Sequence, residues 1–345
     1  VYVLAQVCVV AAYWAVFALA RSVAGPQHAV LAVLLTATVT FFGFPSVAFG
    51  PDVLALPLWA FVALSAYRII GGHRRSGWFM LSIAAGPLVL TTPAAAGLIA
   101  LVLLFALATK RGRRALASFD PLFALAAIAV LALPYLVWLL RGGTIAMSLP
   151  AIPEAGAAAA QWLVLLGRMA AGLAGVAVLV AMVSIPHWRK GEDDPPELVR
   201  AGVPPFARQF VLVFALAPPL GASLFSGLAG RDHVLGGAAT MLVLAGLAAV
   251  MLAGDRIVLR RRQALRAVWA AAVVAPALAI IAAALVQPWI GQHELPTALP
   301  ARDIGQFFSE SFERRTGKPL PAVAGDPQLA ALVGMSGPRP HVLLD

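Results

Sequence analysis

Long apolar segments separated by short polar loops recur along almost the whole chain of 345 residues. A helix that crosses a bilayer needs about 20 predominantly apolar residues. Only 12% of the residues are charged, whereas soluble domains carry about 25%. The sequence therefore predicts an all-α polytopic membrane protein with about ten transmembrane helices. The expected segments are 1–20, 29–46, 53–70, 77–91, 94–109, 121–140, 161–185, 209–229, 234–254 and 267–289.

Basic residues gather in alternate loops between these segments. One set of loops holds 17 Lys and Arg residues, including the run KRGRR, and the opposite set holds Arg141 and Arg231. Cytoplasmic loops of membrane proteins carry an excess of Lys and Arg, so we expect the basic set to face the cytoplasm. The net charge of +10 follows from these loops and does not indicate nucleic-acid binding. Asp52 and the C-terminal tail are expected on the outer face.

The C-terminal tail is more polar than the rest of the chain. Its stretches PAVAG and HVLLD are typical of short strands on either side of a helix that begins near Pro327. The sequence thus predicts a membrane domain over residues 1–290 and the start of a small α/β outer domain over 291–345. Because Val1 lies inside an apolar run and the chain stops just after another, we expect a protein truncated at both ends.

Ionisable side chains beside the outer ends of the spans are the candidates for function, because charges in or near a membrane are expensive. Asp52 opens an apolar helix, where helix capping and catalysis both explain a carboxylate. Glu154 lies in a Pro-flanked outer loop. Arg168 lies about two turns into its helix, where it either snorkels to the surface or binds an anion. Arg231 and His233 share the tight outer turn GRDHV.

Several function classes lack their usual signals. The sequence contains no Walker A, GxGxxG, HExxH or nucleophile-elbow motif. The single cysteine, Cys8, excludes an internal disulfide and a cysteine-based metal site. The spans carry no relay of acidic residues, which a proton-coupled transporter usually needs. The charged candidate residues gather at one face, which favours an enzyme that acts at the membrane surface. The alternative functions are a transporter or flippase-like carrier and a non-catalytic scaffold.

A family likeness is visible in four blocks of the sequence. Three of them begin VYVLAQVCVV, FPSVAFGPDV and GWFMLSIAAG, and the fourth is the tail block RRTGKPLPAVAG. They resemble bacterial family 39-type glycosyltransferases, integral-membrane enzymes related to protein O-mannosyltransferases and aminoarabinose transferases. The resemblance implies transfer of a sugar from a polyprenyl-phosphate donor to a lipid, glycan or protein acceptor. The reaction would take place at the outer face of the bacterial inner (plasma) membrane, with the tail in the periplasm.

The resemblance also implies roles for individual residues. Asp52 matches the second acidic position of the family and is expected to be catalytic. The principal catalytic Asp of the family would precede Val1, so the chain is expected to lack it. Many members carry a Lys-Tyr pair where this sequence reads TTPAA at 91–95. No cofactor is expected, although paired outer carboxylates would permit a divalent metal ion. The expected substrate-binding residues are Glu154, Arg168, Arg231 and His233.

Overall fold

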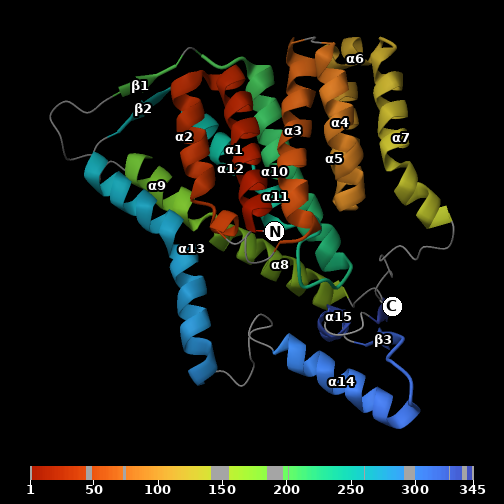
Figure 1. The fold of residues 1–345 in the computed structure, drawn as a ribbon. Coiled ribbons are helices and arrows are strands. Elements are labelled where there is room, and N and C mark those ends of the chain that lie inside the picture. Colours follow the sequence, from red (N-terminus) through yellow and green to blue (C-terminus); the bar gives the residue numbers. More distant parts are fainter. Residues whose placement is uncertain are drawn as a thin grey trace. The chain divides into compact units, whose positions relative to one another are not determined.

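The protein was analysed as a computed structural model, whose two compact units, Val1–Ala277 and Leu278–Asp345, meet inside helix α13 (Figure 1). Their junction precedes the boundary at residue 290 that the sequence predicts. The structure describes residues 2–43, 49–72, 75–140, 155–184, 197–200, 202–259, 261–290, 300–325, 327–335 and 340–343.

The first unit is built almost entirely of helices, and its two described strands, β1 and β2, pair antiparallel. Apolar side chains with good helix propensity, mainly Ala and Leu, fill these helices. The elements are α1 (Tyr2–Ala24), α2 (Pro26–Ala37), η1 (Thr40–Gly43), α3 (Pro51–Gly72), α4 (Ser76–Thr91), α5 (Ala94–Ala108), α6 (Lys110–Leu116), α7 (Asp120–Leu140), α8 (Ala155–Gly172), α9 (Ala174–Ser184), β1 (Glu197–Val199), α10 (Pro205–Leu228), α11 (Ala238–Met241), α12 (Ala245–Leu252), β2 (Arg256–Val258) and α13 (Arg262–Ile290).

Within the described residues, four helices are long and apolar enough to cross a membrane, namely α1, α3, α10 and α13. Two bent pairs raise this number to six if each pair is one span: α5 with α6, bent by 110°, and α8 with α9, bent by 56°. Shorter apolar helices, including α2 and α4, accompany them. The polytopic helical class is thus confirmed in its coarse form, and the number of ten spans stays a prediction.

Helix α3 is the most buried of the four long apolar helices and packs against α1 and α4. Its inward side carries small residues such as Ala60, Ala63 and Ala66, which let helix backbones approach closely. Large apolar side chains instead point outward from the peripheral helices α5 and α7, as expected where lipid takes the place of water. Examples are Leu104, Leu107, Phe123 and Val130.

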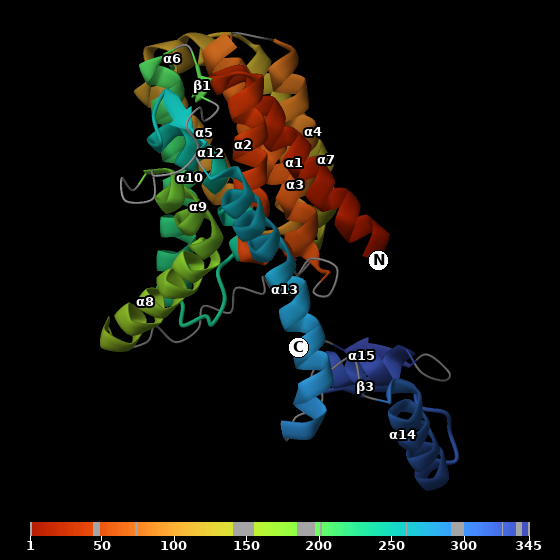
Figure 2. The ribbon, with the colours of Figure 1, turned by 90° about the vertical axis from the view of Figure 1, so that its left-hand side faces the viewer.

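The end of the first unit that carries α6 and the β1–β2 sheet is called here the basic end (Figures 1 and 2). The KRGRR run forms α6, and the guanidinium of Arg111 lies 5.1 Å above the ring of Phe206. Beside the sheet, Arg200 Nε donates to Asp255 Oδ1 at 2.8 Å. The contact between Arg111 and Phe206 anchors α6, and the sequence predicts that this end faces the cytoplasm.

The second unit contains the strand–helix–strand order that the sequence indicated. Helix α14 (Ala301–Thr316) ends at Gly317, whose φ of 67° is the left-handed conformation that glycine adopts most readily. Strand β3 (Ala322–Ala324) pairs parallel with β4 (His341–Leu343), and α15 (Pro327–Met335) connects them. Its assignment to an outer α/β domain stays a prediction.

Candidate functional site

Asp52 lies in the first turn of α3, and its side chain is exposed at the surface of the first unit. The helix starts at Pro51, and the first backbone hydrogen bond runs from Val53 N to Gly50 O at 3.1 Å. A negative charge is favourable there because the helix dipole places partial positive charge at the N-terminus. Asp52 can therefore stabilise the start of α3 and still present its carboxylate to a ligand.

A tight segment between α10 and α11, residues 229–237, is held by a buried serine. We call it the 229–237 loop. Arg231 N donates to Ser226 O at 2.9 Å, and Leu235 N donates to Ser226 Oγ at 2.9 Å. Ser226 belongs to α10 and is fully buried. Because two parts of the loop bond to the same buried residue, the loop backbone is fixed relative to α10.

The 229–237 loop packs directly on Asp52. Gly237 has a φ of 80°, and a Cβ atom there would lie 3.0 Å from Asp52 Cβ and 3.2 Å from Asp52 Oδ2. Just beyond the loop, Thr240 Oγ1 donates to the backbone oxygen of Asp52 at 3.2 Å. His233 belongs to the same loop, four residues before Gly237. A carboxylate from α3 and an imidazole from the loop therefore share one surface.

Helix α8 binds the same loop through two polar side chains. Arg168 Nη1 donates to Asp232 O at 2.9 Å, and Gln161 Nε2 donates to Arg231 O at 2.8 Å. Figures 1 and 2 show α8 at the end of the helical bundle opposite α6. Arg168 is thus directed at the loop backbone, so it positions the loop as well as adding positive charge beside it.

Asp232 and His233 form an exposed pair on this loop. His233 Nδ1 lies 2.8 Å from Asp232 Oδ1. This hydrogen bond, aided by a backbone hydrogen bond and the charges of His233 and Arg168, holds the pKa of the Asp232 carboxyl below its usual value. An ionised carboxylate can only accept, so Nδ1 carries the proton and Nε2 is left for a substrate atom.

The junction between α4 and α5 completes the site. Thr92 Oγ1 accepts from Ala94 N at 3.2 Å and caps the start of α5. A Cβ at Gly236 would lie 2.8 Å from Ala94 Cβ and 3.3 Å from Thr92 Oγ1. The 229–237 loop therefore contacts the TTPAA stretch, where the resembled family often has its Lys-Tyr pair.

Comparison with known proteins identifies the first part of the chain. Residues 1–138 match the family model described as dolichyl-phosphate-mannose-protein mannosyltransferase. The match covers 138 of the 345 residues. The match supports a glycosyltransferase and agrees with a multi-pass membrane protein. No curated protein and no solved structure matches the chain.

The mannosyltransferase-family segment supplies one half of the site. It contains Asp52 and the junction at Thr92, and it ends before Arg168 and the 229–237 loop. Four of the five predicted site residues lie in or against the 229–237 loop: Asp52 packs on it, Arg168 donates to it, and Arg231 and His233 belong to it. Gln161 was missed by the sequence reasoning, although its spacing of two helical turns from Arg168 places both on one face of α8.

Glu154 and a divalent metal ion are the remaining predicted components of the site. Glu154 lies outside the described residues, so its substrate-binding role stays a prediction. Within the part of the chain that the structure describes, no group of three or more His, Cys, Asp or Glu side chains could hold a metal ion. Among the described residues, the groups at this surface that could contact a substrate include the Asp52 carboxylate, the Asp232–His233 pair, Arg168 and Arg231.

Proposed function

We propose that this protein transfers a sugar from a polyprenyl-phosphate donor to a hydroxyl group of a lipid, glycan or protein acceptor. The transfer would take place at the outer face of a bacterial inner membrane, at the surface shared by Asp52 and the 229–237 loop. The observation that carries the proposal is this juxtaposition: the carboxylate belongs to the segment that matches the mannosyltransferase model, and it packs on the loop that contains Arg231 and His233.

The chemistry of the transfer needs both kinds of group. The acceptor oxygen forms a bond to the anomeric carbon of the sugar, and its proton passes to the Asp52 carboxylate as general base. The bond from the anomeric carbon to the donor phosphate breaks, and its electron pair leaves on the phosphate oxygen. Arg231 then stabilises the negative charge on the departing polyprenyl phosphate, and His233 assists as an imidazolium, with Nδ1–H on Asp232 and Nε2–H toward the phosphate.

The cationic loop also offers a replacement for the Lys-Tyr pair of the resembled family. The loop contacts Thr92 and Ala94 through Gly236. The loop that contains Arg231 and His233 therefore lies against the TTPAA stretch. We propose that Arg231 and His233 contact the donor phosphate in place of that pair. Arg168, which donates to Asp232 O, would hold the loop in the required position.

A donor-exchange assay tests the reaction class. Membranes that contain the full-length protein should transfer radiolabelled sugar from a polyprenyl-phosphate carrier, and not from the nucleotide-linked form of the same sugar. Membranes from cells without the gene are the control. Transfer that depends on the nucleotide sugar alone would contradict the proposal, and movement of intact labelled lipid across sealed vesicles without transfer would favour a carrier.

Gly237→Ala should lower sugar transfer roughly tenfold to a hundredfold, because small displacements of a catalytic group are enough to have such effects. The new Cβ would press on the side chain of Asp52. The matched control is Gly254→Ala, since Gly254 also has a positive φ, 96°, but has no neighbour within 4 Å of the added Cβ. Both variants strain the backbone by about 1–2 kcal/mol. Equal activity of the two variants would show that Gly237 serves the turn alone.

A further inference from the structure

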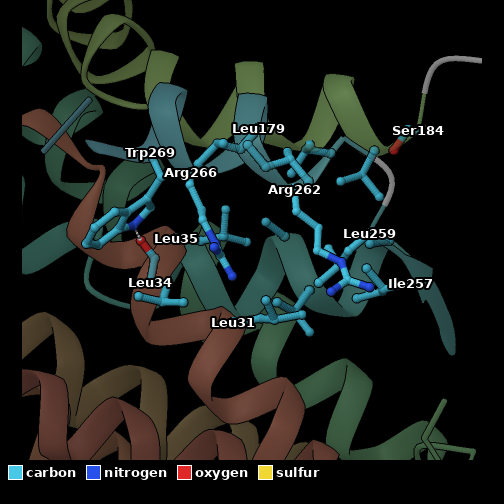
Figure 3. A pocket seen from close by; sticks show the side chains of 16 residues that line it. Leu31, Leu34, Leu35, Leu179, Ser184, Ile257, Leu259, Arg262, Arg266 and Trp269 are labelled. Atoms are coloured by element: carbon cyan, nitrogen blue, oxygen red, sulfur yellow. Dashed lines mark hydrogen bonds between the residues drawn. The ribbon is translucent and has the colours of Figure 1, made fainter. Parts of the chain in front are cut away.

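A cavity of about 400 Å³ lies in the first unit between α2, α9, α12 and the first turns of α13. Figure 3 shows its lining. The walls are mostly aliphatic side chains, such as Leu31, Leu35, Leu179 and Ile257. Its size falls within the range of small-molecule sites, about 300–1,000 Å³. Neither α3, α8 nor the 229–237 loop contributes to the lining, so the cavity is separate from the proposed transfer site.

Two arginines give this apolar cavity its charge. Arg262 and Arg266 are four residues apart at the start of α13 and therefore lie on one face of the helix. Figure 3 shows both side chains extending from α13 among the leucines of the lining. The N-terminus of α13 adds partial positive charge. The ionisable side chains of the lining are thus both basic, which favours a ligand that joins an anionic group to an apolar part.

The shape of the cavity follows from how α13 is attached. Trp269 Nε1 donates to Leu34 O at 2.9 Å and closes one end. Further along α13 the packing is tight, because Gly175 lets Ala272 approach: a Cβ at 175 would lie 3.2 Å from Ala272 Cβ. Between Arg262 and Trp269, the cavity separates α13 from α2 and α12. Only 6% of the apolar stretch of α13 is buried within the protein.

We propose that this cavity binds an anionic membrane phospholipid, with the phosphate at Arg262 and Arg266 and part of an acyl chain against the leucines. Basic pockets between membrane helices bind such headgroups by charge-assisted hydrogen bonds. Phospholipids far outnumber lipid-linked sugars in a membrane, so mass action favours them for a site of this chemistry. The site stands independently of the proposed sugar transfer.

Lipid retention by the purified full-length protein tests this proposal. The protein is reconstituted in nanodiscs of phosphatidylcholine with phosphatidylglycerol, extracted in mild detergent, and analysed by native mass spectrometry. The wild type should retain phosphatidylglycerol in preference to phosphatidylcholine. The double variant Arg262→Gln/Arg266→Gln should retain roughly tenfold less. The matched control, Arg113→Gln/Arg114→Gln in α6, removes equal charge outside the cavity and should retain as much as the wild type.

Other outcomes would overturn the proposal. Equal loss in the two double variants would show non-specific attraction to the protein surface. Preferential retention of polyprenyl phosphate, added at the same mole fraction, would make the cavity a carrier-lipid site. A measurement on the wild type avoids dependence on the folding of the variants: phosphatidylglycerol with a photoreactive acyl chain should cross-link to peptides that contain Leu179 or Leu265. Cross-links confined to other helices would contradict the assignment.

Discussion

Asp52→Asn will lower the rate of sugar transfer roughly 10²- to 10⁴-fold, the usual contribution of a general base. The amide keeps the size and hydrogen-bonding capacity of the side chain but cannot take up the acceptor proton. The packing of Gly237 on this side chain and the bond from Thr240 to the backbone of residue 52 do not require a charge. Transfer from a labelled polyprenyl-phosphate sugar measures the loss, and the amount of protein extracted from the membrane measures insertion.

The matched control for this variant is Asp120→Asn. Asp120 also lies in the first turn of an apolar helix, α7, where its Oδ2 lies 3.6 Å from Arg75 Nε. Both substitutions therefore remove a negative charge from a helix N-terminus, worth about 0.3–1 kcal/mol, and only Asp52 lies beside the 229–237 loop. Transfer by Asp52→Asn equal to that of Asp120→Asn would reduce Asp52 to a stabiliser of its helix.

Gly246→Leu is expected to destabilise the membrane domain by about 3 kcal/mol or more, the upper end of the range for overpacking. Gly246 lies where α12 crosses α2, and a Cβ there would overlap the carbonyl oxygen of Ala32 and the hydroxyl of Thr36. Both neighbours are held in place by α2: the carbonyl is part of its backbone, and Thr36 Oγ1 donates to Ala32 O at 2.8 Å. The helices must therefore separate.

Gly221→Leu is the comparison for this second variant. Gly221 lies within α10, is exposed, and has no neighbour within 4 Å of an added Cβ. Leu in its place should be neutral or stabilise the helix by about 0.8 kcal/mol. Denaturation of both purified variants in detergent, followed by circular dichroism, gives the difference. Equal midpoints would show that α2 and α12 do not pack as described.

The sequence predicted the helical membrane class and singled out four residues that lie in or against the 229–237 loop, because local sequence patterns indicate both. Apolar runs mark helices whatever they pack against, and outer charges such as Asp52 and Arg168 are conspicuous beside them. The lengths of the helices were harder to predict. Residues 161–185 read as one segment, whereas the structure ends α8 at Gly172 and starts α9 at Ala174, because hydropathy does not register a bend inside an apolar run.

The contacts within the site could not be predicted, since they join residues far apart in the sequence through the backbone. Arg168 bonds to a carbonyl oxygen 64 residues away, and Gln161 to one 70 residues away. A carbonyl carries no residue-specific signal, so nothing in the sequence marks Asp232 or Arg231 as its partner. Gly237 was missed for a related reason: its importance lies in the absence of a side chain where Asp52 approaches.

The bond from Thr240 to the backbone of Asp52 spans 188 residues, which has a consequence for biosynthesis. At about 5–20 residues per second, a ribosome needs roughly 10 to 40 s to add Thr240 after Asp52. During this interval α3 has left the ribosome while the segment that covers its first turn does not yet exist. The carboxylate therefore remains without its loop throughout this interval, and the contact forms only after α10 and the 229–237 loop have been made.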